Sequence, residues 1–222
     1  METYVRLFQK IKELQPALEL ESVMFDFETD ALSAFKETFS ESDIAGCFFH
    51  LSQNLWWQIQ KIPGLVHLYG NRADVRLKCK SLLALSFVPP TDVQFAYEIL
   101  QEEGFPPEMK PITDYWENTY VGRRLEGVVP RYAISMWNSF DRLNSDIPRT
   151  NNSLEAWHNA FQKTVDCHRP SLVKLLDKFQ LEQNQSENFM LRYWAGSRSN
   201  ESSKSKYFQL KKRLRPSHGA TR

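Results

Sequence analysis

The sequence predicts an α/β protein that is predominantly helical. Only eight of its 222 residues are glycine, and the helix-forming residues Lys, Glu and Gln are common. Apolar residues recur at helical spacing along most of the chain, whereas two short segments near the amino terminus have strand character. The hydrophobic fraction of 41%, the charged fraction of 25% and the six Trp indicate an ordinary globular protein with a sizeable core.

The two strand signals lie within the first 50 residues. Residues 22–27 form a short apolar run interrupted by one acid, and we expect a buried strand with Asp26 near its carboxyl end. Gly46–His50 is either a second short strand or the start of the next helix. We expect one helix over residues 4–14, before the first strand, and another over residues 29–39, after it.

Nearly all later elements are expected to be helices. The segment Gly122–Arg149 contains Gly and Pro stops and no clear period, so we expect a loop there with one short helix around Trp137. The ranges with helical periodicity are 51–62, 72–86, 91–103, 111–121, 152–166 and a last helix from Pro170 past Trp194.

Charge is concentrated at the carboxyl end of the chain. The net charge is only +1, but seven basic residues and no acid follow Glu201. We expect residues 197–222 to form a solvated, disordered tail. The alternatives are a nuclear import signal or a contact with the DNA backbone, for which Lys211, Lys212 and Arg213 are the candidates.

Cysteine usage and hydropathy indicate the compartment. Three cysteines are too few and too scattered for a disulfide framework, which favours a reducing intracellular compartment. The chain contains no run of 18 apolar residues, so no membrane span is expected. Its amino terminus is an amphipathic pattern with acids, unlike a signal peptide.

Asp26 is the most informative single residue. An acid within an apolar strand is costly to bury unless hydrogen bonds or a metal ion compensate it. In open α/β sheets, ligands gather at the carboxyl ends of strands, which is where we place Asp26. The alternative is that Asp26 caps the helix that follows.

Glu155 lies in the first turn of the helix expected over 152–166. Asn152, three residues earlier, fits a capping box with Glu155. Glu155 and His158 are one helical turn apart, so the same face presents a carboxylate and an imidazole. Arg149 is a candidate for a phosphate contact near this helix start, with a plain surface charge as the alternative.

Cys47 and His50 form a Cys-x-x-His pair, a spacing that suits two ligands of one zinc ion. This pair is only half of a site. Cys167 and His168 are candidates for the other half, although no familiar metal-binding spacing joins the two pairs. The alternative is a packed strand–helix junction, because Cys is often a small buried apolar residue.

Several motifs, taken in order, resemble those of the Mutator-like element (MULE) transposase domain. The similar region spans roughly residues 4 to 185, and the ordered set is more specific than any one motif. The motifs are Asp26-Phe27-Glu28 with Ala31, Gly46-Cys47-x-Phe49-His50-x-x-Gln53, Leu83–Pro89 with Asp92-Val93, Trp137-Asn138, and Arg149-Thr150-Asn151-Asn152-x-x-Glu155-x-Trp157-His158.

This resemblance implies a catalytic domain over residues 1–196 with a partial RNase H-like fold and a large all-helical insertion, roughly residues 62–148. It implies metal-dependent DNA cleavage and strand transfer, in which three acids hold two Mg²⁺ (or Mn²⁺) ions. Such paired hard cations, about 3.5–4 Å apart, favour carboxylate oxygens. By position, Asp26 matches the second acid and Glu155 the third. To the motif residues Cys47, His50 and His158 we assign a structural role.

The sequence departs from the family pattern at its start. The family's first acid lies on a strand well upstream of the second, whereas the 25 residues before Asp26 have the pattern of a helix and a turn. The family's Thr before the second acid is Phe25 here. We therefore expect an amino-terminally truncated fragment that is inactive alone and binds no metal tightly.

Two other functions remain open. One is a retained transposase relic that acts as a nuclear DNA- or protein-binding module, and the other is an unrelated helical interaction domain. DNA is the partner that the resemblance implies, and a homo-oligomer is also considered. The expected location is the nucleus, or otherwise the cytoplasm, with no membrane partner.

Overall fold

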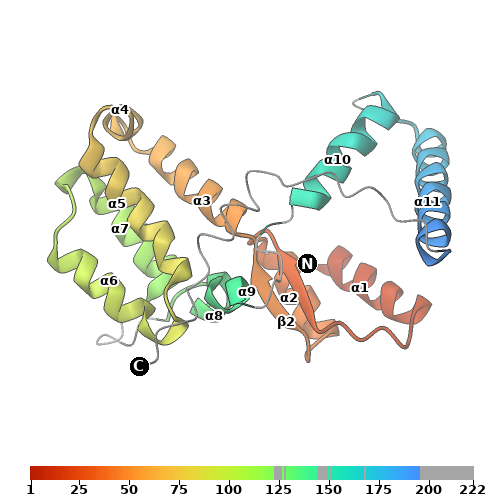
Figure 1. The fold of residues 1–222 in the computed structure, drawn as a ribbon, viewed down its shortest axis with the longest axis horizontal. Coiled ribbons are helices and arrows are strands. Elements are labelled where there is room, and N and C mark those ends of the chain that lie inside the picture. The colour runs from red at the N-terminus through yellow and green to blue at the C-terminus, as the bar shows by residue number, and fades with distance from the viewer. Residues whose placement is uncertain (123–126, 128, 145–149, 151, 168, 196–222) are drawn as a thin grey trace. The chain divides into compact units, whose positions relative to one another are not determined.

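The computed structural model describes residues 1–122, 127, 129–144, 150, 152–167 and 169–195 (Figure 1). Arg149 and the tail expected over 197–222, with Lys211, Lys212 and Arg213, lie outside these residues. The chain divides into two compact units, Met1–Thr150 and Asn151–Arg222. In the described part of the chain, no helix combines the length and the apolar character needed to cross a membrane.

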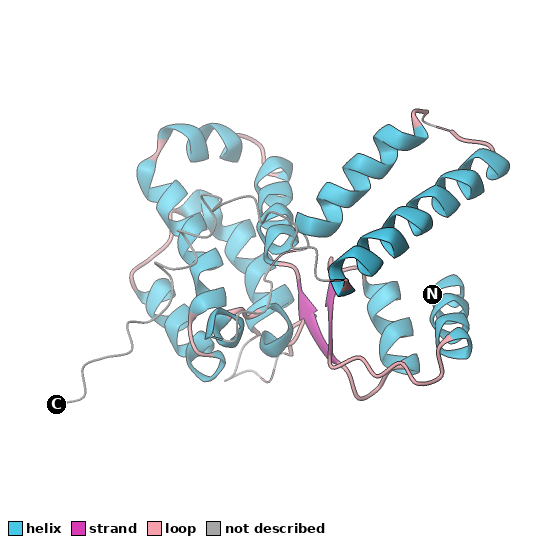
Figure 2. Cartoon of the chain, turned by 45° about the vertical axis from the view of Figure 1, so that its right-hand side comes forward, coloured by secondary structure: helices cyan, strands magenta, loops and turns pink. Residues whose placement is uncertain are grey.

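The first unit begins with a helix followed by a β-α-β unit. The two strands pair in parallel, with Ser22 opposite Asp43 and Phe25 opposite Gly46 (Figure 2). The first helix packs on the second through aromatic rings, with Phe8 edge-on to Phe35 at a centroid distance of 5.4 Å. In chain order these elements are α1 (Glu2–Leu14), β1 (Ser22–Phe25), α2 (Thr29–Thr38) and β2 (Asp43–Gly46).

These elements confirm a first strand that ends directly before Asp26, and the helices on either side of it. The strand is less buried than expected, because Ser22 is exposed and the three residues after it are only half-buried. Gly46–His50 was expected to be either a second short strand or the start of the next helix. Gly46 is the last residue of β2, and the next helix begins at Phe48. The segment is therefore the junction between a strand and a helix.

The rest of the first unit is helical. Its longer helices are α3 (Phe48–Lys61), α4 (Leu65–Asn71), α5 (Ala73–Ala84), α6 (Val93–Glu102) and α7 (Lys110–Trp116). Short 3-10 turns occupy 85–87, 90–92 and 107–109, and a π-helical turn, η4 (Glu117–Val121), extends α7. Two short helices, α8 (Ile134–Trp137) and α9 (Phe140–Asn144), follow.

Two parts of this helical region differ from the expectations. Helix α4 was not expected, because it has only seven residues and a single buried one, Leu65, which leaves almost no periodicity to detect. The loop expected over Gly122–Arg149 contains α9 in addition to the predicted short helix around Trp137. The prediction of a predominantly helical α/β protein is confirmed, because the described residues contain one two-stranded sheet and are otherwise mainly helical.

The core of the first unit is centred on aromatic side chains. Trp116, Tyr120 and Trp137 are fully buried, with Trp116 and Tyr120 at a centroid distance of 4.7 Å. The indole N–H of Trp137 donates a 2.9 Å hydrogen bond to the backbone carbonyl of Tyr120, so α8 is fixed to the end of η4. Burial of each large apolar side chain contributes about 1.5–3 kcal/mol.

The second unit contains two described helices, α10 (Asn152–Val165) and α11 (Leu172–Trp194), both close to their predicted ranges. Trp157 stacks on Phe161, and Phe161 stacks on Phe179 of α11. The indole N–H of Trp157 donates a 2.6 Å hydrogen bond to a carboxylate oxygen of Glu182. These contacts join α10 to α11.

Candidate functional site

Asp26 lies at the carboxyl end of β1, where the backbone takes a sharp turn. The next residue, Phe27, has a φ of 67°, a left-handed conformation that is rare for a bulky side chain and costs on the order of 1–3 kcal/mol. This turn places the Phe27 ring in the core, while the Asp26 side chain remains 49% exposed. The strained turn thus separates an apolar anchor from an accessible acid.

The turn is fixed by residues distant in the sequence. The hydroxyl of Tyr132 donates a 2.7 Å hydrogen bond to the Phe27 carbonyl, and the two rings meet edge to face. Phe27 also contacts Tyr120 edge to face, and its ring tip lies over Gly46 of β2. Phe27 therefore packs against both the neighbouring strand and the segment before α8, and these contacts hold the turn that carries Asp26.

Cys47 and His50, which follow β2, lie beside Asp26. The backbone N–H of Cys47 donates a 2.9 Å hydrogen bond to the Phe25 carbonyl, which continues the strand pairing to the first residue before α3. Cys47 is fully buried, and His50 lies one turn further along α3. The Nδ1 atom of His50 is 3.0 Å from the Oδ1 atom of Asp26, and the His50 side chain is 19% exposed.

Asp26, Cys47 and His50 therefore form one cluster. One ligand atom of each residue lies within 4.8 Å of those of the other two. The structure thus brings Asp26 to the Cys-x-x-His pair. Cys167 is an exposed residue of the second unit, and its pairing with Cys47 and His50 stays a prediction. His168 lies outside the described residues.

The helix-cap alternative for Asp26 is wrong. The N-cap position of α2 is occupied by Glu28, and this helix start has no side-chain capping hydrogen bond. The Asp26 carboxylate is instead directed at His50. The reason is the left-handed turn at Phe27, which separates Asp26 from the helix start that follows.

Glu155 and His158 lie on α10 in the second unit. Glu155 is half-buried in the first turn, and His158 is exposed with its ring tilted against that of Trp157. The side chain of Asn152, the partner in the predicted capping box, is outside the described part of the chain. The pairing of Asp26 with Glu155 at one metal site stays a prediction.

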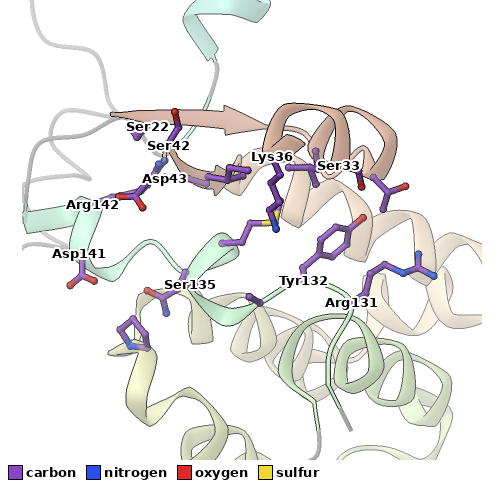
Figure 3. Close-up of a pocket in the computed structure, with 18 of the residues that line it drawn as sticks. Ser22, Ser33, Lys36, Ser42, Asp43, Arg131, Tyr132, Ser135, Asp141 and Arg142 are labelled. Carbon is purple, nitrogen blue, oxygen red and sulfur yellow. The ribbon is translucent and has the colours of Figure 1, made fainter. Parts of the chain in front are cut away.

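A cavity of about 730 Å³, with both polar and apolar side chains in its wall, runs along β2 and α2 (Figure 3). Ser22 and Asp43, the first residues of β1 and β2, are part of its wall. Burial lowers the pKa of the Arg142 guanidinium, and the nearby Asp43 carboxylate opposes this shift. No sequence pattern predicted this cavity, because its charged side chains come from separate segments: Lys36, Asp43, Arg131, Asp141 and Arg142.

The donors beside Asp26 do not fit a magnesium site. Mg²⁺ requires a nearly octahedral shell of oxygen atoms, whereas this cluster supplies one carboxylate, one imidazole and one thiol. A comparison with protein-family models, with curated proteins and with solved structures found no match to the chain.

Proposed function

We propose that the chain is a transposase-derived DNA-processing domain of the Mutator-like type. The observation that supports this proposal best is the cluster of Asp26, Cys47 and His50 after two neighbouring parallel strands. Asp26 directly follows one strand and the Cys-x-x-His pair directly follows the next, so two motifs of the series lie side by side. The carboxyl ends of parallel strands are also where open α/β sheets bind their ligands.

The proposal includes a partial RNase H-like fold with a helical insertion over roughly residues 62–148. In support, β1, α2 and β2 form a β-α-β unit, and the residues after it are helical. The insertion would begin near the end of α3 and include the core of Trp116, Tyr120 and Trp137. That core also anchors Phe27, so the helical block supports the strand ends that carry Asp26.

The proposed substrate is the DNA backbone. Asp26 and Glu155 are the two acids proposed to face it, and Lys211, Lys212 and Arg213 are proposed to neutralise phosphates. Because the donors around Asp26 do not form an oxygen shell, we propose that this chain binds DNA without cleaving it efficiently. The location proposed for such a domain is the nucleus.

DNA binding tests the proposal. Fluorescence anisotropy with a labelled duplex is expected to show an affinity that falls with salt, because bound cations are released from the phosphates. Replacing Lys211, Lys212 and Arg213 with Ala is expected to reduce the slope of log K against log salt by roughly 2–3. A matched variant removes three exposed lysines elsewhere, Lys61, Lys80 and Lys163, and is expected to retain the wild-type slope. Absence of binding at low salt would contradict the proposed function.

A plasmid-nicking assay tests the catalytic part. With Mg²⁺ or Mn²⁺ present, we expect no nicking that depends on Asp26. Nicking by the wild type that disappears in Asp26→Asn would show that the chain is an active nuclease, and the proposed lack of efficient cleavage would then be wrong.

A protein-binding module is a second candidate, favoured by apolar side chains on α11. Leu172, Val173, Leu176 and Phe179 are all at least 46% exposed although they are large and hydrophobic. Sedimentation of the purified chain tests whether this surface joins two copies. A monomer at all concentrations, for both the wild type and Leu176→Gln, would exclude self-association.

A further inference from the structure

The cluster of Asp26, Cys47 and His50 offers a mixed set of donors. Oxygen, sulfur and imidazole nitrogen together suit a borderline metal ion such as Zn²⁺, whereas hard ions such as Mg²⁺ prefer oxygen alone. We propose that Asp26, Cys47 and His50 form a zinc site with three protein ligands. This inference does not rest on the proposed DNA function, since it depends only on the three side chains.

The distances support this site. In a tetrahedral zinc site, Zn–N, Zn–O and Zn–S bonds of about 2.0–2.3 Å place the ligand atoms roughly 3.3–3.6 Å from one another. The His50 Nδ1 and Asp26 Oδ1 atoms are 3.0 Å apart, and all three donors lie within 4.8 Å. A shift of about 1 Å closes the site, and the 49% exposed Asp26 side chain has room to make it.

The backbone places the other two ligands before any metal binds. Cys47 is the N-cap residue of α3 and is tied to β1 through its backbone N–H. His50 is three residues later, on the same face of the 14-residue helix. The backbone therefore holds both ligands at the start of α3.

Among the described residues these three are the ligands, so a tetrahedral ion would keep a fourth position. Cys47 closes the buried side of the cluster, whereas Asp26 and His50 retain partial exposure. A zinc ion held by three protein ligands binds water or a substrate at its fourth position. On binding, the S–H bond of Cys47 breaks as the Zn–S bond forms, and the proton passes to solvent.

Cobalt binding tests this site without DNA. Co²⁺ added to the purified, metal-free chain is expected to produce a thiolate-to-cobalt absorption band at one equivalent, and Zn²⁺ is expected to remove it. The variants Cys47→Ser, His50→Gln and Asp26→Asn are each expected to weaken binding by at least about tenfold. Matched controls are Cys167→Ser and His67→Gln, which change an exposed Cys and a His outside the cluster and should bind as the wild type does.

Thermal unfolding is a second measurement, needed because a variant could lose the cobalt band by failing to fold. Zinc bound to the native state alone raises the midpoint of thermal unfolding, and this shift is expected for the wild type and not for Asp26→Asn. The Asp26 side chain is half exposed, so this variant preserves the core even if Cys47→Ser does not fold. An unchanged cobalt band in Cys47→Ser, or no band in the wild type, overturns the zinc site.

The two proposals fail separately. Loss of the cobalt band with DNA binding intact removes the zinc site and leaves the proposed function. A cobalt band without any DNA binding supports the zinc site and contradicts the proposed DNA function.

Discussion

A single methyl group on Gly46 is expected to disrupt the strand ends that carry Asp26. A Cβ atom at this position would lie 2.4 Å from the Cζ atom of Phe27 and 3.0 Å from two further ring carbons. The Phe27 ring has little freedom to retreat, because it is wedged between Tyr120 and Tyr132 and its backbone is already at a φ of 67°. Overpacking of this kind costs about 1–3 kcal/mol, so we expect Gly46→Ala to lower the unfolding free energy by that amount.

Thermal unfolding followed by circular dichroism measures this effect. For a chain of this length, a loss of about 1–3 kcal/mol lowers the unfolding midpoint by about 2–12 °C. The matched control is Gly70→Ala in α4, an exposed glycine whose added Cβ would meet nothing within 4 Å. Ala favours helix over Gly, so this control is expected to raise stability by about 0.5 kcal/mol.

A double-mutant cycle ties the cost to the ring of Phe27. Phe27→Ala alone is expected to cost about 3–5 kcal/mol through the cavity it leaves. In that background Gly46→Ala should cost almost nothing, which gives a coupling energy of about 1–3 kcal/mol. Two results would refute this reasoning. One is that Gly46→Ala unfolds at the wild-type temperature, and the other is that it lowers the free energy of unfolding equally in the Phe27→Ala background.

Four further predictions concern Tyr132, Cys79 and Trp157. Tyr132→Phe removes the hydroxyl that donates to the buried Phe27 carbonyl, and this carbonyl is then left without its hydrogen bond. Denaturant unfolding is expected to show that the free energy of unfolding falls by about 1–3 kcal/mol. Burial raises the pKa of the Cys79 thiol from 9.0 to about 11. At pH 8 a thiol reagent should therefore label the exposed Cys167 much faster than it labels Cys79. The same raised pKa means that stability falls as pH rises from 9 to 11. This loss should be smaller in Cys79→Ala, and the buried Tyr120, whose pKa burial also raises, accounts for part of what remains. Trp157→Phe removes the 2.6 Å hydrogen bond to Glu182 and is expected to speed amide exchange in α11, whereas equal exchange would show that ring stacking suffices.

The sequence by itself determined most of the local structure. Periodicity located the long helices, because burial of one face imposes a repeat that each segment carries on its own. A short apolar run of strand-forming residues located the first strand. The Cys-x-x-His spacing likewise singled out Cys47 and His50 as two candidate ligands of one metal ion. Helix α4 escaped detection because seven residues with one buried side chain contain no repeat.

Only the tertiary structure decided which residues meet. Asp26 joins Cys47 and His50 because β1 and β2 pair in parallel with Phe25 opposite Gly46, a register that no single segment encodes. The direction of the Asp26 side chain depends on Tyr132, whose hydroxyl holds the Phe27 carbonyl across 105 residues of sequence. Such contacts arise from packing between distant segments, so the residue types of the site were visible in the sequence while their convergence was not.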